Sequence, residues 1–281
     1  MSSPADTLTV ALVRETFTQG QPASRLRARL IEARDRGATL AVLPELPLDH
    51  WCPASDVARA EDAEPPEGRR HRVLAAAAAD ASIGVVGGAI VADPASGRRH
   101  NTALVFDAAG ALVARYRKVH VPWEAGFWER AHYDAGDEQP EVFCHFGLPL
   151  GLQLCSDLLR PQGCQILGAA GAEAILAPRA TLDWTWERWR TVIRANAITS
   201  AVYVLSASRP GPEHTVSIGG PSVAVDPHGE VLLETQEPLA VVTLNREVVS
   251  EARAGYPGYL DVRAALYSKG WGAVAAKEPT R

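Results

Sequence analysis

Short apolar runs and helical spacings of apolar residues alternate along the chain. Residues 8–13 form a largely apolar run that predicts a buried strand. The next apolar positions recur at intervals of three or four residues, which places them on one face of a helix: Ala23, Leu26, Leu30 and Ala33. Residues 39–43 predict a second strand, which ends at Pro44 because proline has no N–H to donate to a sheet. The pattern therefore begins as strand, helix, strand.

The same alternation continues to about residue 245. Helices are predicted over 71–80 and 161–170 and on the face formed by Trp186, Trp189, Ile193 and Ala197. Strands are predicted at 83–91, 142–146, 150–154, 174–177, 202–206 and 241–244. Two further segments, 102–116 and 221–234, have turn residues between apolar runs, as antiparallel hairpins do. We therefore predict a single α/β domain over 1–281, with its core at about 7–245.

Composition and charge disfavour several classes of protein. With 281 residues, of which 47% are hydrophobic and 22% charged, the chain is typical of a folded globular domain. Its formal net charge of -5 disfavours nucleic acid and anionic lipid as partners, because both attract basic surfaces. The longest apolar stretch, 83–91, is far shorter than the roughly 20 residues of a membrane span, and the N-terminus has no signal-peptide pattern. We expect a cytoplasmic protein with no membrane partner.

The cysteines and histidines form no metal-binding pattern in the sequence. Cys52, Cys144, Cys155 and Cys164 include no CxxC pair, and none of the eight histidines belongs to an HxxxH pair. We therefore expect reduced thiols, no metal and no cofactor, so that any chemistry comes from the side chains themselves.

Three polar residues follow predicted strands, where side chains often converge on a cleft. They are Glu45, Lys118 and Cys155. A thiol with a pKa of about 8.5 is mostly protonated at neutral pH, so a cysteine nucleophile needs a base or a cation beside it. The glutamate is a candidate base and the lysine a candidate cation. Taken singly, each has a plainer interpretation: a small core residue, a loop carboxylate and a lysine on a solvated basic rim.

The three segments together resemble a known superfamily. Glu45 lies in a PE motif, Lys118 in YRKVH, and Cys155 in a C-x-D pattern. In this order and context they resemble the nitrilase, or carbon-nitrogen hydrolase, superfamily over about residues 7–245. The resemblance implies a four-layer αββα sandwich, a cofactor-free enzyme, and a homodimer or larger homo-oligomer. It also implies that the tail, residues 246–281, takes part in oligomer contacts.

A mechanism follows from this resemblance. Glu45 takes the proton of Cys155, and the thiolate attacks the carbonyl carbon of an amide or N-carbamoyl compound to form a thioester. Lys118 and the backbone N–H of Ser156 stabilise the oxyanion of the tetrahedral intermediate. The same glutamate then activates the water that releases the acid.

The superfamily also uses a second glutamate, which accepts a hydrogen bond from the lysine and keeps it charged. The segment 126–137, GFWERAHYDAGD, resembles the corresponding stretch of the N-carbamoyl-amine amidase branch. This resemblance assigns the role to Glu129, with Glu124 as the competing candidate. A glutamate on a helix surface is the plainer interpretation of Glu129.

The residues after the cysteine narrow the substrate class. True nitrilases carry a Trp-Glu pair there, whereas this chain has Ser156 and Asp157, which favours amide or carbamoyl cleavage over nitrile hydrolysis. Branches that act on N-carbamoyl amino acids place arginines a few residues later to bind a carboxylate. Leu158 and Leu159 take those positions here, which leaves Arg160 as a substitute.

Other candidates for substrate contact are aromatic or charged. Trp123, Trp128 and Trp184 lie beside the proposed catalytic segments, and their apolar faces either line a pocket or pack in a core or interface. Arg179 and Asp183 follow the predicted strand 174–177, where they could bind polar ends of a substrate.

Three rival functions use the same residues differently. The thioester of an amide-forming acyltransferase would pass its acyl group to an amine instead of water. A catalytically silent binding member of the superfamily would keep the fold without the chemistry. A redox protein would form a reversible disulfide between Cys155 and Cys164.

Overall fold

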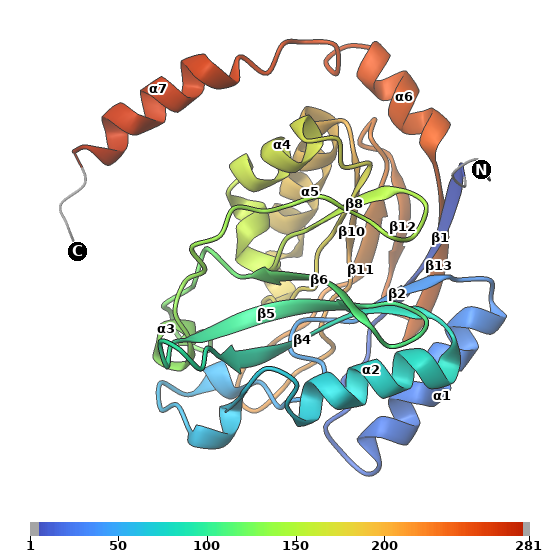
Figure 1. Ribbon diagram of the computed structural model, residues 1–281, viewed down its shortest axis with the longest axis vertical. Helices are drawn as coiled ribbons and strands as arrows, with labels where there is room; N and C mark the ends of the chain where they lie inside the picture. The colour runs from blue at the N-terminus through green and yellow to red at the C-terminus, as the bar shows by residue number, and fades with distance from the viewer. Residues whose placement is uncertain (1–5, 278–281) are drawn as a thin grey trace.

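Two β-sheets form the centre of the computed structural model, which describes residues 6–277 (Figure 1). The strands of the first sheet are β1 Thr7–Val13, β2 Leu40–Val42, β3 Ala63–Glu64, β4 Gly84–Ala92, β5 Arg99–Phe106, β6 Leu112–Arg117 and β13 Leu239–Asn245. Those of the second are β7 Phe143–Cys144, β8 Pro149–Leu152, β9 Ala174–Leu176, β10 Tyr203–Ser206, β11 Ser222–Val225 and β12 Val231–Thr235. The first sheet has the order β13-β1-β2-β4-β5-β6, with β3 paired to β4, and the second has the order β12-β11-β10-β9-β8-β7.

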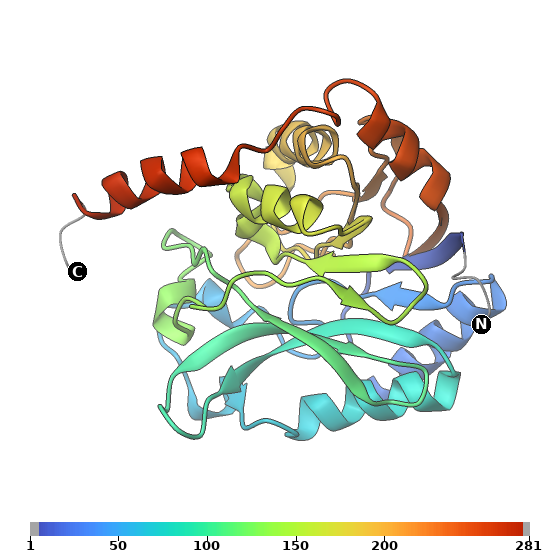
Figure 2. The same cartoon turned by 45° about the horizontal axis from the view of Figure 1, so that its top comes forward.

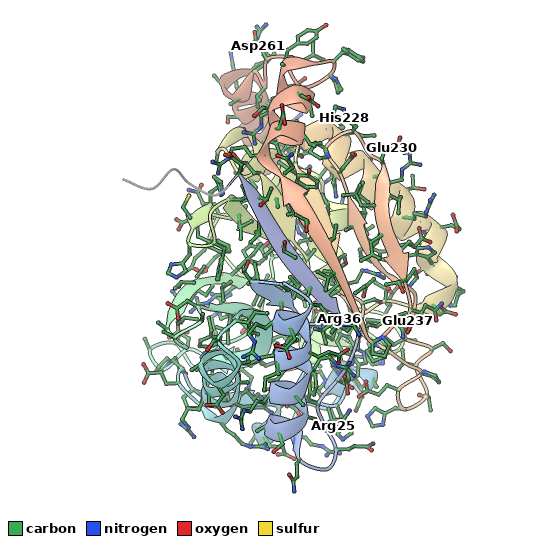
Figure 3. The ribbon with its side chains drawn as sticks, turned by 90° about the vertical axis from the view of Figure 1, so that its right-hand side faces the viewer. Arg25, Arg36, His228, Glu230, Glu237 and Asp261 are labelled. Atoms are coloured by element: carbon green, nitrogen blue, oxygen red, sulfur yellow. The ribbon has the colours of Figure 1, made fainter. Side chains whose placement is uncertain are left out.

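Each sheet mixes parallel and antiparallel pairs, as the sequence predicts. Strands β1, β2 and β4 pair in parallel, and so do β8, β9 and β10. Both predicted hairpins are confirmed: β5 pairs with β6 and β11 with β12, each antiparallel. Strand β13 runs antiparallel to β1 with Thr7 opposite Asn245, so the first and last strands lie side by side (Figure 3).

Helices cover the outer face of each sheet. Helices α1 Pro22–Asp35 and α2 Arg69–Ala81 lie against the first sheet, and α4 Gln162–Ala169 and α5 Trp186–Ser200 against the second (Figure 2). The apolar faces predicted for α1 and α5 are the buried ones, although Ala23 is exposed. Each pair of helices shares a buried apolar cluster with its sheet, through Leu26, Leu30 and Leu74 on one side and Leu167, Trp189 and Ile193 on the other.

A third cluster fills the space between the sheets. It joins side chains of the first sheet, such as Val10 and Leu12, to side chains of the second, such as Leu150 and Leu205. Because both inner faces are apolar, the sheets stack face to face and exclude water from their interface. The four-layer αββα sandwich and its single domain are therefore confirmed.

Several short elements differ from the prediction. Strands β7 and β8 are shorter than the predicted 142–146 and 150–154, and the extended chain after β8 ends at Cys155, which has a left-handed φ of 45°. The pattern also missed short helices, which are α3 Glu129–His132 and the 3₁₀ helices η1 Cys52–Ala54, η2 Ala60–Asp62, η3 Cys155–Leu159 and η4 Asp183–Thr185. These elements are too short to show a period.

The tail after β13 contains two helices that were not predicted, α6 Arg246–Ala254 and α7 Ala264–Ala275. Helix α6 buries Val249 and Ala252, whereas α7 buries none of its residues and extends away from the sandwich (Figure 2). Large apolar side chains of this segment are exposed, among them Leu260, Leu266, Tyr267, Trp271 and Val274. Between residues 6 and 277, no helix is both long enough and apolar enough to span a membrane.

A cavity in the core between the two sheets should lower the free energy of unfolding. Leu150 in β8 is fully buried, so Leu150→Ala is expected to lower the free energy of unfolding by about 2–5 kcal/mol. Leu232→Ala in β12 is the matched control, because Leu232 is 47% exposed, and it should cost less than about 0.5 kcal/mol. Chemical denaturation followed by circular dichroism measures both. Equal losses in the two variants would contradict the placement of Leu150 between the sheets.

Candidate active site

The three residues singled out in the sequence each lie just after the end of a strand. Glu45 follows β2, Lys118 follows β6 directly, and Cys155 follows β8 of the second sheet. Strand β6 runs in the same direction as β2, because two antiparallel steps through β5 separate it from β4. The chain therefore leaves β2 and β6 at the same end of the first sheet, which places Glu45 and Lys118 together.

Lys118 bridges two carboxylates in the interior. Its Nζ donates a hydrogen bond of 2.8 Å to Glu45 Oε1 and one of 2.6 Å to Glu129 Oε2. No more than 1% of any of the three residues is exposed. Buried charges are tolerated only when they are paired and hydrogen-bonded, so the three groups depend on one another. Glu124 is exposed and pairs with Phe127 in a loop bridge, so the glutamate that contacts the lysine is Glu129.

Burial and charge together set the protonation of this cluster. Burial raises the pKa of Glu129 to about 7, and the nearby charge of Glu45 adds to the rise while Lys118 opposes it. Burial alone would lower the pKa of Lys118, but the charges of Glu129 and Glu45 outweigh it and hold that pKa well above the usual value. The lysine is therefore charged at neutral pH, and Glu129 changes its charge close to neutrality.

Neighbouring groups add hydrogen bonds to both carboxylates, although Glu129 Oε1 is buried without a partner among the described residues. Asn101 Nδ2 donates to Glu45 Oε1 over 2.8 Å, and the backbone N–H of Ala180 donates to Glu45 Oε2 over 3.1 Å. The Tyr133 hydroxyl donates to Glu129 Oε2 and accepts from Asn101 Nδ2 over 3.2 Å. The sequence analysis missed Asn101 and Tyr133. The available signal was the spacing of Tyr133, four residues after Glu129, which brings both to one side of a helical turn.

Cys155 is held with its thiol buried beside this cluster. Its N–H donates to the carbonyl of Pro178 over 3.0 Å, and its Sγ donates to the carbonyl of Ala180 over 3.1 Å. Burial raises the pKa of the thiol well above its usual value, the charge of Glu45 raises it further, and Lys118 opposes the shift. The resting residue is therefore a neutral thiol that needs a base to become a nucleophile.

Asp157 ties the cysteine segment to the lysine segment. Its buried carboxylate accepts hydrogen bonds from the Tyr116 hydroxyl at 2.9 Å and from the His120 backbone N–H at 2.8 Å. Since Lys118 lies between these two donors, Asp157 fixes the position of the lysine relative to the cysteine two residues before it. The sequence analysis gave Asp157 no such role, because the contact joins residues that are about 40 positions apart.

Ser156 presents a free donor next to the thiol. Its hydroxyl donates to the carbonyl of His120. Its backbone N–H bonds to no residue in the range 6–277 and is therefore available to a ligand. Ser156 also lines a surface cleft of about 760 Å³, together with Tyr133, Arg130 and Arg160. Because Tyr133 contacts Glu129, this cleft lies next to the ion cluster.

Arg209 supports the backbone around Glu45, and the sequence analysis missed it. The fully buried guanidinium donates to the carbonyl oxygens of Glu45 at 2.9 Å, Leu46 at 2.7 Å and Asp49 at 2.6 Å. Leu46 has a positive φ of 49°, which is unfavourable for a leucine. The guanidinium also forms an ion pair of 2.7 Å with Glu213. Arg209 thus holds the strained turn that presents the Glu45 carboxylate.

The tryptophans predicted for substrate contact lie at different depths. Trp123 and Trp128 pack edge to face with ring centroids 4.9 Å apart, just before the helix that carries Glu129. Trp123 is 52% exposed and Trp184 is 72% exposed. These positions leave apolar surface open to a ligand or a second protein, so a role in substrate binding stays a prediction.

Arg179 and Asp183 are both engaged within the protein. Arg179 is fully buried, and its guanidinium donates to Ser206, Thr181 and the carbonyl of Pro221. It also lies over the rings of Trp186 and Trp189, at 5.1 Å and 5.7 Å. Asp183 is exposed and accepts the N–H of Gly220 over 3.0 Å. The structure therefore places Arg179 in the packing beneath the site and Asp183 at the surface.

Potential metal ligands lie outside the ion cluster. Within residues 6–277, two groups could hold a metal: His50, Glu213 and His214, and the trio Cys52, Asp62 and His132. Neither group contains Glu45, Lys118 or Cys155. The arrangement of the cluster itself, a base and a cation beside a thiol, suits nucleophilic attack on a carbonyl carbon.

Comparison with known proteins identifies relatives over most of the chain. Omega-amidase NIT2 of Homo sapiens is 30% identical over 260 residues, which cover 88% of this chain and 90% of that protein. A Pseudomonas protegens protein named hydrolase in pqqF 5'region is 30% identical over 250 residues, covering 86% and 84%. The deaminated glutathione amidase of Synechocystis is 31% identical over 176 residues, covering 58% and 63%.

Solved structures share the fold. A carbon-nitrogen hydrolase from Helicobacter pylori superimposes with a TM-score of 0.81 at 22% identity, covering 94% of this chain and 98% of that chain. An amidase from Nesterenkonia sp. superimposes with a TM-score of 0.78 at 26% identity, covering 94% and 96%. Residues 9–254 match the family described as carbon-nitrogen hydrolase. The chain therefore belongs to the carbon-nitrogen hydrolase family.

Proposed function

We propose that this carbon-nitrogen hydrolase is an amidase that cleaves a linear amide or an N-carbamoyl compound through a thioester on Cys155. The observation that carries the proposal is the buried bridge from Lys118 to Glu45 and Glu129 beside the thiol. This arrangement places a nucleophile, a base and a fixed positive charge together in one buried site. Ground-state packing alone gives no reason to bury three charges.

In the first half-reaction, the Glu45 carboxylate takes the thiol proton and the Cys155 sulfur attacks the substrate carbonyl carbon. The oxyanion that forms accepts hydrogen bonds from Lys118 Nζ and from the free N–H of Ser156, each worth about 3 kcal/mol in the transition state. The intermediate collapses as the C–N bond breaks. The departing nitrogen takes the proton held by Glu45, and ammonia or an amine leaves.

In the second half-reaction, water replaces the amine. Glu45, ionised again, takes a proton from the water, whose oxygen attacks the thioester carbon. Collapse of this second intermediate breaks the C–S bond, releases a carboxylic acid and returns the proton to the sulfur. Glu129 touches no reacting atom in this scheme and acts through Lys118, so it is a positioning residue.

The names of the relatives support amide chemistry. Omega-amidase NIT2 and the deaminated glutathione amidase are named as amidases. A variant of the Nesterenkonia amidase, 26% identical to this chain, shows covalent addition of the acetamide moiety of fluoroacetamide at its active-site cysteine. That adduct keeps its amide group and is joined through a thioether, so it supports a nucleophilic cysteine in that protein, which is the role proposed for Cys155.

The rival functions account for less of the site. A disulfide between Cys155 and Cys164 requires an attacking thiolate, but burial raises the pKa of Cys164 to about 12. A silent binding protein would not need a base and a cation on the buried thiol. An acyltransferase would use the same thioester, and the two activities differ only in whether water or an amine attacks it.

We further propose that the tail pairs with a second copy of the chain. Tyr267, Trp271 and Val274 recur at helical spacing on α7, are all exposed, and form an apolar stripe. Within residues 6–277, α7 buries none of its residues, and an apolar stripe left exposed in this way favours a protein partner. A homodimer or larger homo-oligomer fits both this stripe and the expected role of the tail.

Loss of the nucleophile or of the base should abolish hydrolysis. Cys155→Ala removes the attacking atom, and Glu45→Gln removes the proton acceptor while keeping its shape, so ammonia release from primary amides is expected to fall by at least about 10³-fold in each. A coupled ammonia assay measures the rates. Cys164→Ala is the matched control, because Cys164 is also a buried free thiol, and it should keep most of the activity. Activity near the wild-type level in either test variant would refute the mechanism.

The ionisation of Glu129 should determine how kcat/KM changes at acidic pH. The pKa of this carboxyl is about 7, so lowering the pH through 7 protonates it and removes its ion pair with Lys118. Wild-type kcat/KM should therefore fall below about pH 7. The glutamine of Glu129→Gln cannot titrate, so the fall in kcat/KM below pH 7 should disappear in this variant. Its kcat/KM at neutral and higher pH should be lower than that of the wild type by about tenfold or more. A fall that is unchanged in the Gln variant would show that Glu129 does not govern it.

If α7 holds the assembly together, charged residues in its apolar stripe should make the assembly dissociate into single chains. Introducing two charges into the stripe, by Tyr267→Asp with Trp271→Asp, should raise the protein concentration at which the assembly dissociates by at least about tenfold. Light scattering after size exclusion measures this against the 30.0 kDa of one chain. Leu232→Asp, on exposed β12, controls for an added surface charge. An assembly that keeps its mass when the stripe is charged would contradict the proposal.

A further inference from the structure

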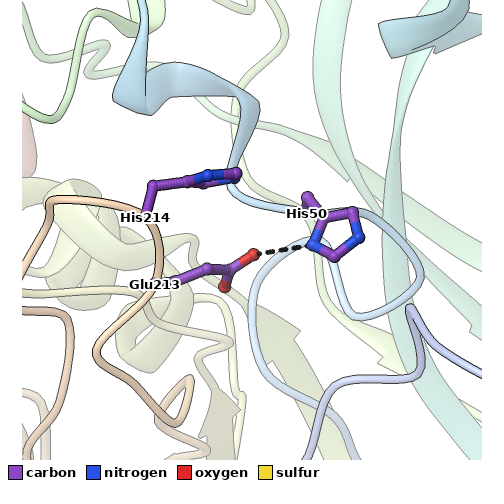
Figure 4. A group of neighbouring side chains, drawn as sticks. All are labelled: His50, Glu213 and His214. Carbon is purple, nitrogen blue, oxygen red and sulfur yellow. Dashed lines mark ion pairs between the residues drawn. The ribbon is translucent and has the colours of Figure 1, made fainter.

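His50, Glu213 and His214 form a cluster on two loops near the catalytic glutamate. One ligand atom from each residue lies within 4.8 Å of the others. Figure 4 shows the Glu213 carboxylate facing the His50 ring, with the His214 ring close to both; the centroids of the two rings are 5.9 Å apart. His50 follows Glu45 by five residues, and the other two belong to the segment that begins at Arg209. None of the proposed catalytic steps uses this cluster.

The two imidazoles are free to bind a ligand. Both histidines are exposed, and neither ring donates or accepts a hydrogen bond with any residue between 6 and 277. The nearest contact is between His50 Nδ1 and Glu213 Oε1, at 3.5 Å. Neutral imidazole nitrogens and a carboxylate oxygen are a common ligand set of zinc.

The second group of potential ligands is already satisfied internally. His132 Nδ1 lies 3.1 Å from Asp62 Oδ2, and His132 Nε2 lies 2.7 Å from the carbonyl of Ser55. Both ring nitrogens therefore already lie at hydrogen-bond distance from an oxygen of the protein, unlike those of His50 and His214. Burial also raises the pKa of the neighbouring Cys52 thiol, which disfavours the thiolate that a metal would need.

The separation of the ligand atoms fits a tetrahedral ion. Bonds of about 2.0–2.1 Å to a tetrahedral zinc place ligand atoms roughly 3.4 Å apart. The 3.5 Å between His50 Nδ1 and Glu213 Oε1 matches that edge. His214 needs only a side-chain adjustment at the surface to reach the same distance, because the three atoms already lie within 4.8 Å.

The carboxylate of Glu213 is preorganised by its neighbours. Its Oε2 accepts from Arg209 Nε over 2.8 Å, and its Oε1 accepts from Arg209 Nη2 over 2.9 Å and from the Trp51 N–H over 2.7 Å. Its position is therefore fixed before an ion arrives, and an ion bound at Oε1 would share that oxygen with these two donors. The positive charge of Arg209 weakens the attraction between the Glu213 carboxylate and a cation. A metal ion at this site must therefore also form coordinate bonds to uncharged ligands. Imidazoles meet that need for transition metals, whereas Mg²⁺ and Ca²⁺ prefer a set made of oxygens.

We propose that His50, Glu213 and His214 bind one divalent transition-metal ion of the zinc class, with water in the fourth position. The ion would cross-link the loop after Glu45 to the loop after Arg209. Because Arg209 donates to the carbonyls of Glu45 and Leu46, the cross-link would reinforce the turn that presents the catalytic carboxylate. The proposal rests on this geometry and does not depend on the proposed reaction.

Calorimetric titration of the full chain with ZnCl₂ tests the site directly. The titrations use protein stripped with EDTA and carrying Cys144→Ser and Cys155→Ala, so that neither the exposed thiol nor the candidate nucleophile contributes. We expect one Zn²⁺ per chain. His50→Ala and His214→Ala each remove one of three ligands and should weaken binding by at least about tenfold.

His228→Ala is the matched control. His228 is exposed at the turn between β11 and β12, as Figure 3 shows, and its removal should leave zinc affinity unchanged. Melting temperatures provide a second measurement: at the same zinc concentration, Zn²⁺ should raise the value for the parent and the His228 variant by more than it does for the other two. The absence of Zn²⁺ binding would overturn the proposal, and so would binding that His50→Ala and His214→Ala leave unchanged.

Discussion

The ammonium group of Lys118, held between two carboxylates where no water reaches it, is the interaction on which the site depends. Removing one partner of such a buried set leaves an unpaired charge and typically costs about 3–5 kcal/mol. The carboxylates therefore hold the lysine in place, and the lysine allows both carboxylates to be buried. Asn101 and Tyr133 donate to the same carboxylate oxygens as the lysine, and the N–H of Ala180 donates to the other oxygen of Glu45. The network places these charges beside a neutral thiol.

The sandwich makes this arrangement possible by bringing strand ends from two sheets together. The first sheet supplies Glu45 and Lys118, and the second supplies Cys155. Two buried groups then fix the parts relative to one another. Asp157 ties the cysteine segment to the chain around Lys118, and Arg209 ties the turn after β2 to the loop that carries Glu213. The apolar inter-sheet core keeps water out of the region these contacts span.

Periodicity and apolar runs were sufficient to predict most of the strands, the four covering helices and both hairpins, because each buries an apolar face. They missed β3, which has only two residues, and the tail helices, of which α7 buries no face at all. The three motifs together, in the order of the superfamily, were sufficient to single out Glu45, Lys118 and Cys155 as candidates, although each motif alone has a plainer interpretation. The supporting residues Asn101, Tyr133, Asp157 and Arg209 could not be predicted in this way. The partners of Asn101, Asp157 and Arg209 lie far away along the chain, and only the folded sheets bring them together. Tyr133 is only four residues from Glu129, and that spacing alone assigns it no role. Arg179 illustrates the same limit, since its place after a strand did not reveal that its guanidinium is buried under two tryptophans.

The measurement that tests the central claim most directly is intact-mass spectrometry of the chain, quenched in acid while it turns over primary amides and N-carbamoyl amines. The account predicts a transient mass increase equal to the acyl group, mapped by peptide analysis to Cys155 and absent from Cys155→Ala, while ammonia or an amine accumulates. Loss of the acyl adduct with release of the free acid would identify water as the acceptor. Transfer of the acyl group to an added amine would identify an acyltransferase. Hydrolysis of an amide with no adduct on Cys155, in samples quenched from the first milliseconds onward, would contradict the thioester mechanism.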